Sequence, residues 1–265
     1  MTALTYNDVQ ARVGATSAHP GAFIATLELL AHLHPRPGAR VLECGCGTGR
    51  TAVHLAHLGA KVTAVDRNGV MLEKARRRAA AEGVLVDWRE GDIRALPFAD
   101  GQFDLVLAES VSVFNALAEV IPEYFRVVAP GGRVADLEIA ARPGLPPASR
   151  EALCRFFGFV QLPTLAEWKD AYRAAGFSPV ALWRPRRLDL TSLQRSNERY
   201  PDPHNLSDPG VADDPEVQAM LLENGLLMAA NHRHLAFAAT IGVKPAPGEQ
   251  PGRPRWRRLW QRFQV

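Results

Sequence analysis

The chain has 265 residues, of which 47% are hydrophobic and 22% are charged, and its formal net charge is +3. This composition is ordinary for a globular protein, and the charge is too small to indicate a nucleic-acid partner by itself. The three cysteines exclude a disulfide framework and fit a reducing compartment.

Two further features bear on the location of the protein. Residues 1–14 (MTALTYNDVQARVG) are polar where a secretory signal needs an apolar centre. The sequence also lacks an apolar run of the roughly 18–20 residues that span a bilayer. We therefore expect a cytoplasmic protein without a transmembrane segment.

The first clear helix is predicted over residues 20–34, where apolar residues recur at helical spacing. Short apolar strands and helices then alternate. Strands are expected over residues 39–45, 61–66, 85–92, 103–110 and 131–139. The intervening helices are expected over residues 51–59, 70–83 and 115–128. This α/β alternation predicts a doubly wound, Rossmann-like sheet with helices on both faces, which binds its ligand at the carboxyl ends of the strands.

The pattern changes after residue 141. A proline-rich connection (141–149) precedes a helix over residues 162–177, which begins after Thr164. Strands expected over residues 178–185 and 235–245 complete a seven-stranded, mostly parallel sheet. Between them lies an insert with a proline-rich loop and a helix over residues 215–232. An insert of this length is either a cap over the ligand site, or a surface excursion or dimer contact.

These elements divide the chain into four parts. The α/β domain comprises residues 38–184 and 234–245, and an N-terminal helical segment (1–37) precedes it. The insert occupies residues 185–233, and a basic tail occupies residues 246–265. The end of that tail, PGRPRWRRLWQRFQV, contains five arginines and no acidic residue.

The run VLECGCGTGR after the first clear helix offers two kinds of chemistry. Cys44 and Cys46 supply two thiolates, but structural zinc takes about four ligands, and Cys154 lies far along the chain. We therefore expect no metal and interpret both cysteines as small residues in a crowded turn.

The glycines of the same run indicate a ligand-binding loop. Gly45, Gly47 and Gly49 allow a ligand to approach the backbone, and the following helix offers free N–H groups. The dinucleotide fingerprint would place glycine at position 50, where this sequence has Arg50. This substitution argues against a nicotinamide or flavin cofactor.

Acidic residues follow the next three strands. Asp66 could accept hydrogen bonds from both hydroxyls of a ribose, or it could cap the next helix. Asp92 could contact an adenine amino group beside the Ile93 amide, or it could be a turn residue. Glu109 and Ser110 bring a carboxylate and a hydroxyl to the mouth of the site.

Five motifs, in this order and spacing, resemble the class I S-adenosylmethionine-dependent methyltransferases: VLECGCGTGR, VTAVD, GDIRALPF, FDLVLAES and FRVVAPGGRV, within residues 38–140. The resemblance implies that S-adenosylmethionine is the cofactor and that the reaction is an in-line displacement at its methyl group. It assigns Glu43, Gly45 and Gly47 to the methionine part and Asp66 to the ribose. Asp92 and Ile93 would contact the adenine. Cofactor-binding roles are also expected for Met71, Cys46, Arg67 and Glu109.

The segment SAHPGAF, with His19, Pro20 and Gly21, resembles a segment that closes over the cofactor in small-molecule members of this family. His19 and Glu109 are therefore candidate general bases by location. The alternative is that each only contacts the cofactor or the loop.

The resemblance favours a small-molecule acceptor. FDLVLAES lacks the Asn/Asp-Pro-Pro-aromatic run typical of enzymes that methylate amino groups of nucleic acids. One alternative is an RNA or protein methyltransferase that docks through the basic tail, where Trp256, Trp260 and Phe263 accompany the arginines. The tail could equally be a helix that packs on a neighbour or an anionic membrane, or a solvated end. A non-catalytic S-adenosylmethionine-binding protein and a homodimer are further alternatives.

Overall fold

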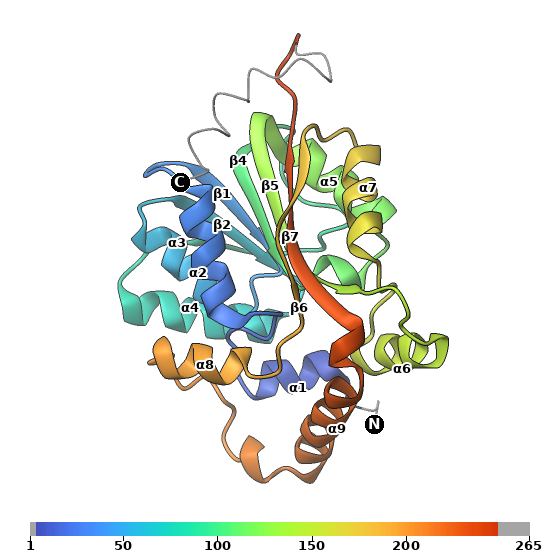
Figure 1. Cartoon of the computed structure of the whole chain (residues 1–265). Helices are drawn as coiled ribbons and strands as arrows, with labels where there is room; N and C mark the ends of the chain where they lie inside the picture. The colour runs from blue at the N-terminus through green and yellow to red at the C-terminus, as the bar shows by residue number, and fades with distance from the viewer. Residues whose placement is uncertain (1–3, 249–265) are drawn as a thin grey trace.

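The computed structural model describes residues 4–248 of the chain. Within these residues, seven strands form one sheet, which Figure 1 shows in the centre of the molecule. The strands are β1 (Arg40–Cys44), β2 (Lys61–Asp66), β3 (Asp87–Glu90), β4 (Phe103–Glu109), β5 (Val128–Ala141), β6 (Val180–Arg187) and β7 (Leu235–Val243).

The strand order is β3-β2-β1-β4-β5-β7-β6, and β7 runs antiparallel to both of its neighbours. The predicted seven-stranded, mostly parallel, Rossmann-like sheet is confirmed. The strand order changes direction between the parallel neighbours β1 and β4. The chain continues from β1 to β2 and β3 on one side, and from β4 to β5 on the other. Cys44 at the end of β1 is in register with Val65 of β2 and Ala108 of β4, so the carboxyl ends of three strands meet at one edge.

Nine α-helices and three short 3-10 helices complete the described residues. The α-helices are α1 (Tyr6–Arg12), α2 (Ala22–Leu33), α3 (Arg50–His57), α4 (Gly69–Glu82), α5 (Leu117–Val127), α6 (Pro147–Phe157), α7 (Leu165–Ala174), α8 (Ser192–Arg199) and α9 (Pro215–Asn231). The 3-10 helices are η1 (Ser112–Phe114), η2 (Val211–Asp213) and η3 (His232–His234). In Figure 1, α2, α3 and α4 lie to one side of the sheet and α5 and α7 to the other. Helices α1, α6, α8 and α9 gather below it, at the end where the site lies.

The core lies on both faces of the central strands. Four consecutive residues of β1 are buried, and eight consecutive residues of β7 are buried. Such continuous apolar runs are expected where helices cover a sheet on both faces. None of the helices within residues 4–248 is long and apolar enough to cross a membrane.

The expected helices and strands over residues 20–141 are present, whereas α1, α6 and α8 were not predicted. The expected connection over residues 141–149 is wrong in its second half, because α6 begins at Pro147. Proline is favourable in the first turn of a helix, where its missing N–H costs nothing. Helix α1 is a short helix whose start is fixed by a capping box between Thr5 and Asp8.

Candidate active site

A cavity of about 780 Å³ lies at the carboxyl ends of β1, β2 and β4. All the residues predicted to bind cofactor or to act as a base line this one cavity. They are His19, Glu43, Gly45, Cys46, Gly47, Asp66, Arg67, Met71, Asp92, Ile93 and Glu109. The cavity therefore joins residues that are up to 90 positions apart in the sequence, from His19 to Glu109.

The three glycines of the loop after β1 have different roles. All have positive φ angles, of 68° at Gly45, 52° at Gly47 and 78° at Gly49. A Cβ atom at Gly49 would lie 2.6 Å from the Trp88 side chain, so this glycine lets α3 begin close against β3. A Cβ atom at Gly47 would meet no atom within 4 Å. Gly47 therefore borders open space in the cavity, into which a ligand can fit.

The backbone of this loop is tied to β2. The N–H groups of Gly45 and Cys46 both donate to the carbonyl oxygen of Val65, at 2.8 and 3.1 Å. The Gly47 N–H donates to Asp66 Oδ2 at 2.8 Å. These three N–H groups thus have hydrogen-bond partners within the protein. The loop therefore contributes open space for a ligand, and these three groups are not free to donate to it. Burial raises the pKa of the Cys46 thiol well above its usual value, which fits a small apolar role for this side chain.

Asp66 does not cap the helix that follows it. That role belongs to Asn68, whose side chain accepts from the N–H groups of Val70 and Met71. Asp66 Oδ1 accepts from the Asn68 N–H at 2.9 Å, and the carboxylate borders the cavity. Burial raises the pKa of Asp66, and the hydrogen bonds from Asn68 and Gly47 oppose that rise. Asp66 is therefore a fixed acceptor with lone pairs left for a ligand.

Glu43 is a buried carboxylate with incomplete hydrogen bonding. Its side-chain atom Oε2 is inaccessible to solvent and has no hydrogen-bond partner. Burial raises the pKa of Glu43 well above its usual value, and the nearby Glu109 and Asp66 carboxylates raise it further. An unsatisfied buried acceptor beside two other acids is costly without a ligand. The arrangement therefore favours a ligand that carries positive charge or a hydrogen-bond donor.

Glu109 is held by two threonines that sequence reasoning missed. Thr26 Oγ1 donates to Glu109 Oε1 at 2.6 Å, and Thr51 Oγ1 donates to Oε2 at 2.8 Å. His19 Nε2 lies 3.1 Å from Thr26 Oγ1. Since the single proton of the Thr26 hydroxyl points to Glu109, His19 must donate through Nε2. Thr26 is fully buried in α2, which only the structure reveals.

Asp92 lies at the rim of the cavity. Its carboxylate pairs with Arg94 Nη2 at 2.6 Å, and its side chain is 37% exposed. Hydrogen bonds from the Arg94 side chain are the main reason that the pKa of Asp92 is lowered. The neighbouring Ile93 is buried, and Met71 lines the cavity from the first turn of α4.

The backbone after β4 is strained beside the cavity. Ser110 has a φ angle of 53°, which is uncommon for a residue other than glycine. The Ser110 N–H donates to the Leu137 carbonyl oxygen at 3.0 Å. Glu138 Oε1 then accepts from the N–H groups of Val111 and Ser112 at 2.8 and 2.7 Å. Two residues of β5 thus fix the turn that carries the chain from Glu109 to Phe114.

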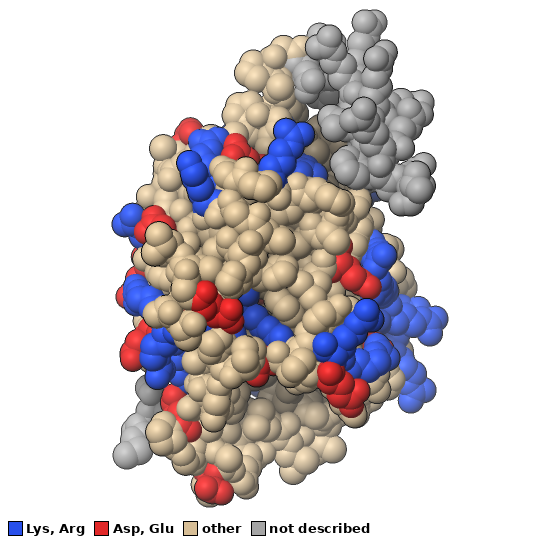
Figure 2. Space-filling model, turned by 90° about the vertical axis from the view of Figure 1, so that its left-hand side faces the viewer, with Lys and Arg blue, Asp and Glu red and all other residues tan. Residues whose placement is uncertain are grey.

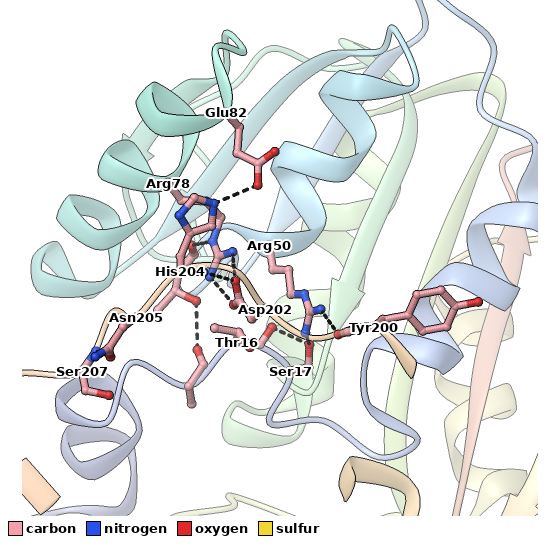
Figure 3. A network of polar contacts seen from close by, with 12 residues as sticks. Thr16, Ser17, Arg50, Arg78, Glu82, Tyr200, Asp202, His204, Asn205 and Ser207 are labelled. Atoms are coloured by element: carbon pink, nitrogen blue, oxygen red, sulfur yellow. Dashed lines mark hydrogen bonds and ion pairs between the residues drawn. The ribbon is translucent and has the colours of Figure 1, made fainter. Parts of the chain in front are cut away.

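The insert is fastened to the helices that flank the glycine loop, as Figure 3 shows. Arg78 of α4 is 2% exposed and makes two hydrogen bonds to Asp202, of 2.8 and 2.7 Å. Its Nε atom donates to the carbonyl oxygen of Thr48 in the glycine loop at 3.0 Å. Arg50 donates to the carbonyl oxygen of Tyr200 at 2.6 Å. The insert is therefore attached beside the glycine loop by buried, charge-assisted hydrogen bonds.

The N-terminal segment is attached to the same helix. Lys74 of α4 donates to the carbonyl oxygen of Ala11 in α1, and its Nζ lies 2.7 Å from Asp208 Oδ1. Arg12 pairs with Asp214 at 2.7 Å. Residues 4–20 and the insert thus form a joint cover, and both contribute residues to the cavity lining.

The lining of the cavity consists of two walls of different character. The carboxylate wall comprises the acids that follow the first four strands, Glu43, Asp66, Asp92 and Glu109. The apolar wall comes from α1, η1, α6 and the insert, and comprises Tyr6, Phe114, Phe157, Phe159, Leu188, Leu190, Leu193, Leu221 and Met228. The sequence predicted all four members of the carboxylate wall and none of the apolar wall.

Residues 41–132 match the protein family described as a methyltransferase domain. The chain is 37% identical over 172 residues to the uncharacterized methyltransferase YodH of Bacillus subtilis, a match that covers 65% of this chain and 74% of that protein. It is 31% identical over 188 residues to the demethylmenaquinone methyltransferase of Symbiobacterium thermophilum, covering 68% of this chain and 70% of that protein.

The fold is also shared with a solved structure. The phosphoethanolamine N-methyltransferase 2 of Haemonchus contortus, in complex with S-adenosyl-L-methionine, superposes with a TM-score of 0.69 at 20% identity. The alignment covers 90% of this chain and 57% of that one. Sequence relatives, sheet order and the position of the cavity agree. The chain belongs to the class I S-adenosylmethionine-dependent methyltransferases, and S-adenosylmethionine is its cofactor.

Proposed function

We propose that the protein transfers the methyl group of S-adenosylmethionine to a small-molecule acceptor enclosed in the cavity. The observation that carries this proposal is the joining of the two walls in one cavity. The carboxylate wall suits a cationic cofactor, and the apolar wall leaves room for an acceptor beside it. Helix α1 and the insert, which carry much of the apolar wall, also cover the carboxylate wall and would restrict access by macromolecules.

The carboxylate wall fits the charge of the cofactor. S-adenosylmethionine supplies an electrophilic methyl group on a sulfonium and also carries an ammonium group. Glu43 lines the cavity and would contribute negative charge beside that ammonium. The open space beside Gly47 would hold the methionine part, with Gly45 and Cys46 forming the adjoining backbone.

The remaining predicted residues would hold the nucleoside part. Asp66, fixed by Gly47 and Asn68, would accept hydrogen bonds from the ribose hydroxyls, with Arg67 beside it. Met71 and Ile93 would contact the adenine ring, and Asp92 at the rim would accept from its amino group. Because Arg94 already pairs with Asp92, we assign to Asp92 the weakest of these contacts.

The network around Glu109 would position the reacting groups. Glu109 retains lone pairs that can accept a proton, whereas His19 Nε2 already donates to Thr26. We therefore favour Glu109 over His19 as the base, if the acceptor must lose a proton. Most of the rate acceleration would come from orientation within an enclosed cavity, which requires no base at all.

One feature of the structure supports a small molecule over RNA or protein as the acceptor. The cavity lies beneath the joint cover of α1 and the insert, so a large substrate would have to displace buried ion pairs. The aromatic and basic end of the tail, on which the RNA alternative rests, lies outside the described residues. The relative named for demethylmenaquinone makes that compound one acceptor to test.

Methyl-labelled S-adenosylmethionine, incubated with the protein and a bacterial extract, tests the proposal. We expect label in the small-molecule fraction, and equal turnover by a variant without residues 251–265. Label confined to RNA or protein, and lost with that deletion, would establish the alternative. Calorimetry with S-adenosylhomocysteine in parallel verifies that both proteins bind the cofactor product.

A further inference from the structure

Within residues 4–248, the two cationic side chains that line the cavity either are engaged by the protein or lie beside the carboxylate wall. Arg50 and Arg67 are the lysine or arginine residues among the described lining. The Arg50 guanidinium lies 3.9 Å from the centre of the Phe23 ring and donates to Tyr200 and Ser17. Arg67 directly follows Asp66, on the side of the carboxylate wall, and its positive charge favours the charged forms of Asp66 and Asp92. The residues of the apolar wall include no lysine or arginine, so a phosphate or carboxylate on an acceptor bound there would meet no cation of that wall.

The one charged side chain that the insert contributes to the lining is also neutralised. Asp189 Oδ1 accepts from the Thr191 N–H at 2.9 Å and from the Thr191 hydroxyl at 2.8 Å. Its other oxygen pairs with Arg195. Asp189 is thus satisfied within its own turn, so a cationic acceptor gains little from it.

The apolar wall contains a continuous aromatic cluster. The rings of Tyr6 and Phe157 meet edge to face at 4.8 Å between centroids. Phe157 and Phe159 stack at 5.0 Å with 15° between their planes, and Phe114 packs on Phe159 at 5.1 Å. Such a surface favours a flat, apolar body. Amide side chains of Asn197 and Asn224 line the same cavity and can bind a hydroxyl or carbonyl group.

Exposed leucines continue this wall to the outside. Leu190 and Leu193 of the α8 region are 46% and 49% exposed, and Leu221 of α9 is 42% exposed. All three also line the cavity, and we call them the leucine rim. In Figure 2 the lowest part of the molecule, where Figure 1 places α9 and the loop before it, carries few charged side chains. Exposed leucines gathered at the mouth of a cavity indicate a binding surface.

We propose that the acceptor is an uncharged molecule with an apolar, ring-containing body and an apolar extension that lies on the leucine rim. This inference rests on the proposed function, because it assumes that the apolar wall binds the acceptor. The aromatic cluster would hold the body beside Glu109, and Leu190, Leu193 and Leu221 would cover the extension. Because the apolar wall contains no lysine or arginine, it disfavours phosphorylated and carboxylated acceptors.

The test uses the full chain loaded with S-adenosylhomocysteine and measures the affinity of matched probes by calorimetry. We expect para-hexylphenol to bind about tenfold more tightly than para-cresol, because its chain buries additional methylene groups. We expect para-hexylphenyl phosphate and para-hexylbenzylamine to bind about tenfold more weakly than para-hexylphenol, because each buries an unpaired charge. Tighter binding of either charged probe would overturn the proposal.

Rim variants locate the effect. Leu193→Ser with Leu221→Ser should weaken para-hexylphenol binding about tenfold and leave para-cresol binding unchanged. Leu222→Ser is the matched control, because Leu222 is 65% exposed on the same helix and does not line the cavity. Equal effects of the rim variant and the control on both probes would contradict the proposal.

The remaining outcomes distinguish other occupants of the leucine rim. If the rim variant changes the sedimentation of the protein but not probe affinity, the rim is an interface between copies of this chain. If it abolishes binding to phosphatidylcholine vesicles but leaves probe affinity unchanged, the rim is a membrane contact. Either result overturns the proposal. Failure to bind S-adenosylhomocysteine would instead reject the proposed function.

Discussion

The two walls of the cavity are built in different ways. The carboxylate wall comes from the ends of neighbouring parallel strands, whose shared direction brings its acids to the same edge of the sheet. The apolar wall comes from α1, η1, α6 and the insert, which are brought together only by contacts over long sequence distances. The cofactor is the same throughout the family, so its wall can be built into the rigid sheet. The wall that meets the acceptor is carried on attached segments, which can change without disturbing the sheet.

The largest expected effect comes from removing the attachment of the insert, which carries part of the apolar wall, to the glycine loop. Arg78→Met removes the buried cation that joins the insert to the glycine loop and leaves Asp202 unpaired. We expect the free energy of unfolding in urea to fall by about 3–5 kcal/mol. The control Arg155→Met breaks an exposed pair with Glu151 and should cost about 0.5 kcal/mol or less. Similar losses in the two variants would show that the attachment of the insert is not a stabilising feature.

The next effect isolates the carboxylate wall. Asp66→Ala should raise the dissociation constant of S-adenosylmethionine about 100-fold, since two hydrogen bonds to a charged acceptor are lost. Isothermal titration calorimetry measures this change. Asp87→Ala, on β3 with its side chain 51% exposed, should bind like the wild type. Wild-type affinity in Asp66→Ala would place the ribose elsewhere.

The different roles of Gly47 and Gly49 in the glycine loop can be distinguished by matched substitutions. Gly49→Ala forces a Cβ against Trp88 and Ala75, at 2.6 and 2.8 Å, and should reduce stability by about 2 kcal/mol. Gly47→Ala meets no protein atom and should cost about 1 kcal/mol of backbone strain. Its main effect should be weaker cofactor binding, measured by calorimetry beside thermal unfolding. Intact binding in Gly47→Ala would mean that the space beside Gly47 is not used.

The smallest effect concerns β5, the strand whose Glu138 side chain fixes the turn after Glu109. Asp136 precedes Glu138 on β5 by two residues, and burial raises the pKa of Asp136 from 3.8 to about 7. The unfolded chain therefore releases this proton first, so the free energy of unfolding should fall as the pH rises from about 4 to about 7. In Asp136→Asn this slope should be shallower and stability at pH 8 higher, because the amide oxygen can still accept from Tyr172.

Urea unfolding at several pH values measures this dependence. Asp87→Asn, at an exposed position, is the control and should keep the wild-type slope. An unchanged slope in Asp136→Asn would assign the pH dependence to other buried acids, of which Glu138 is the nearest candidate on the same strand.

How much of this site could be predicted depended on how local its determinants are. The acids Glu43, Asp66 and Glu109 each lie at or one residue before the end of a strand, so the strand pattern alone placed them at one edge of the sheet. Thr26 and Thr51 escaped prediction, because a threonine in a helix carries no signal of the carboxylate it will meet. The same holds for Arg78 and Asp202, which are 124 positions apart.

The sequence by itself determined the alternation of strands and helices, the glycine loop and the acids of the carboxylate wall. These follow from backbone propensity and from the spacing of residues within short motifs, which act before any long-range contact forms. Only the tertiary structure decided which insert residues face the cavity, how the cover is attached, and that the wall opposite the acids is apolar and aromatic. These depend on side chains from distant segments that share one space, and only packing brings such segments together.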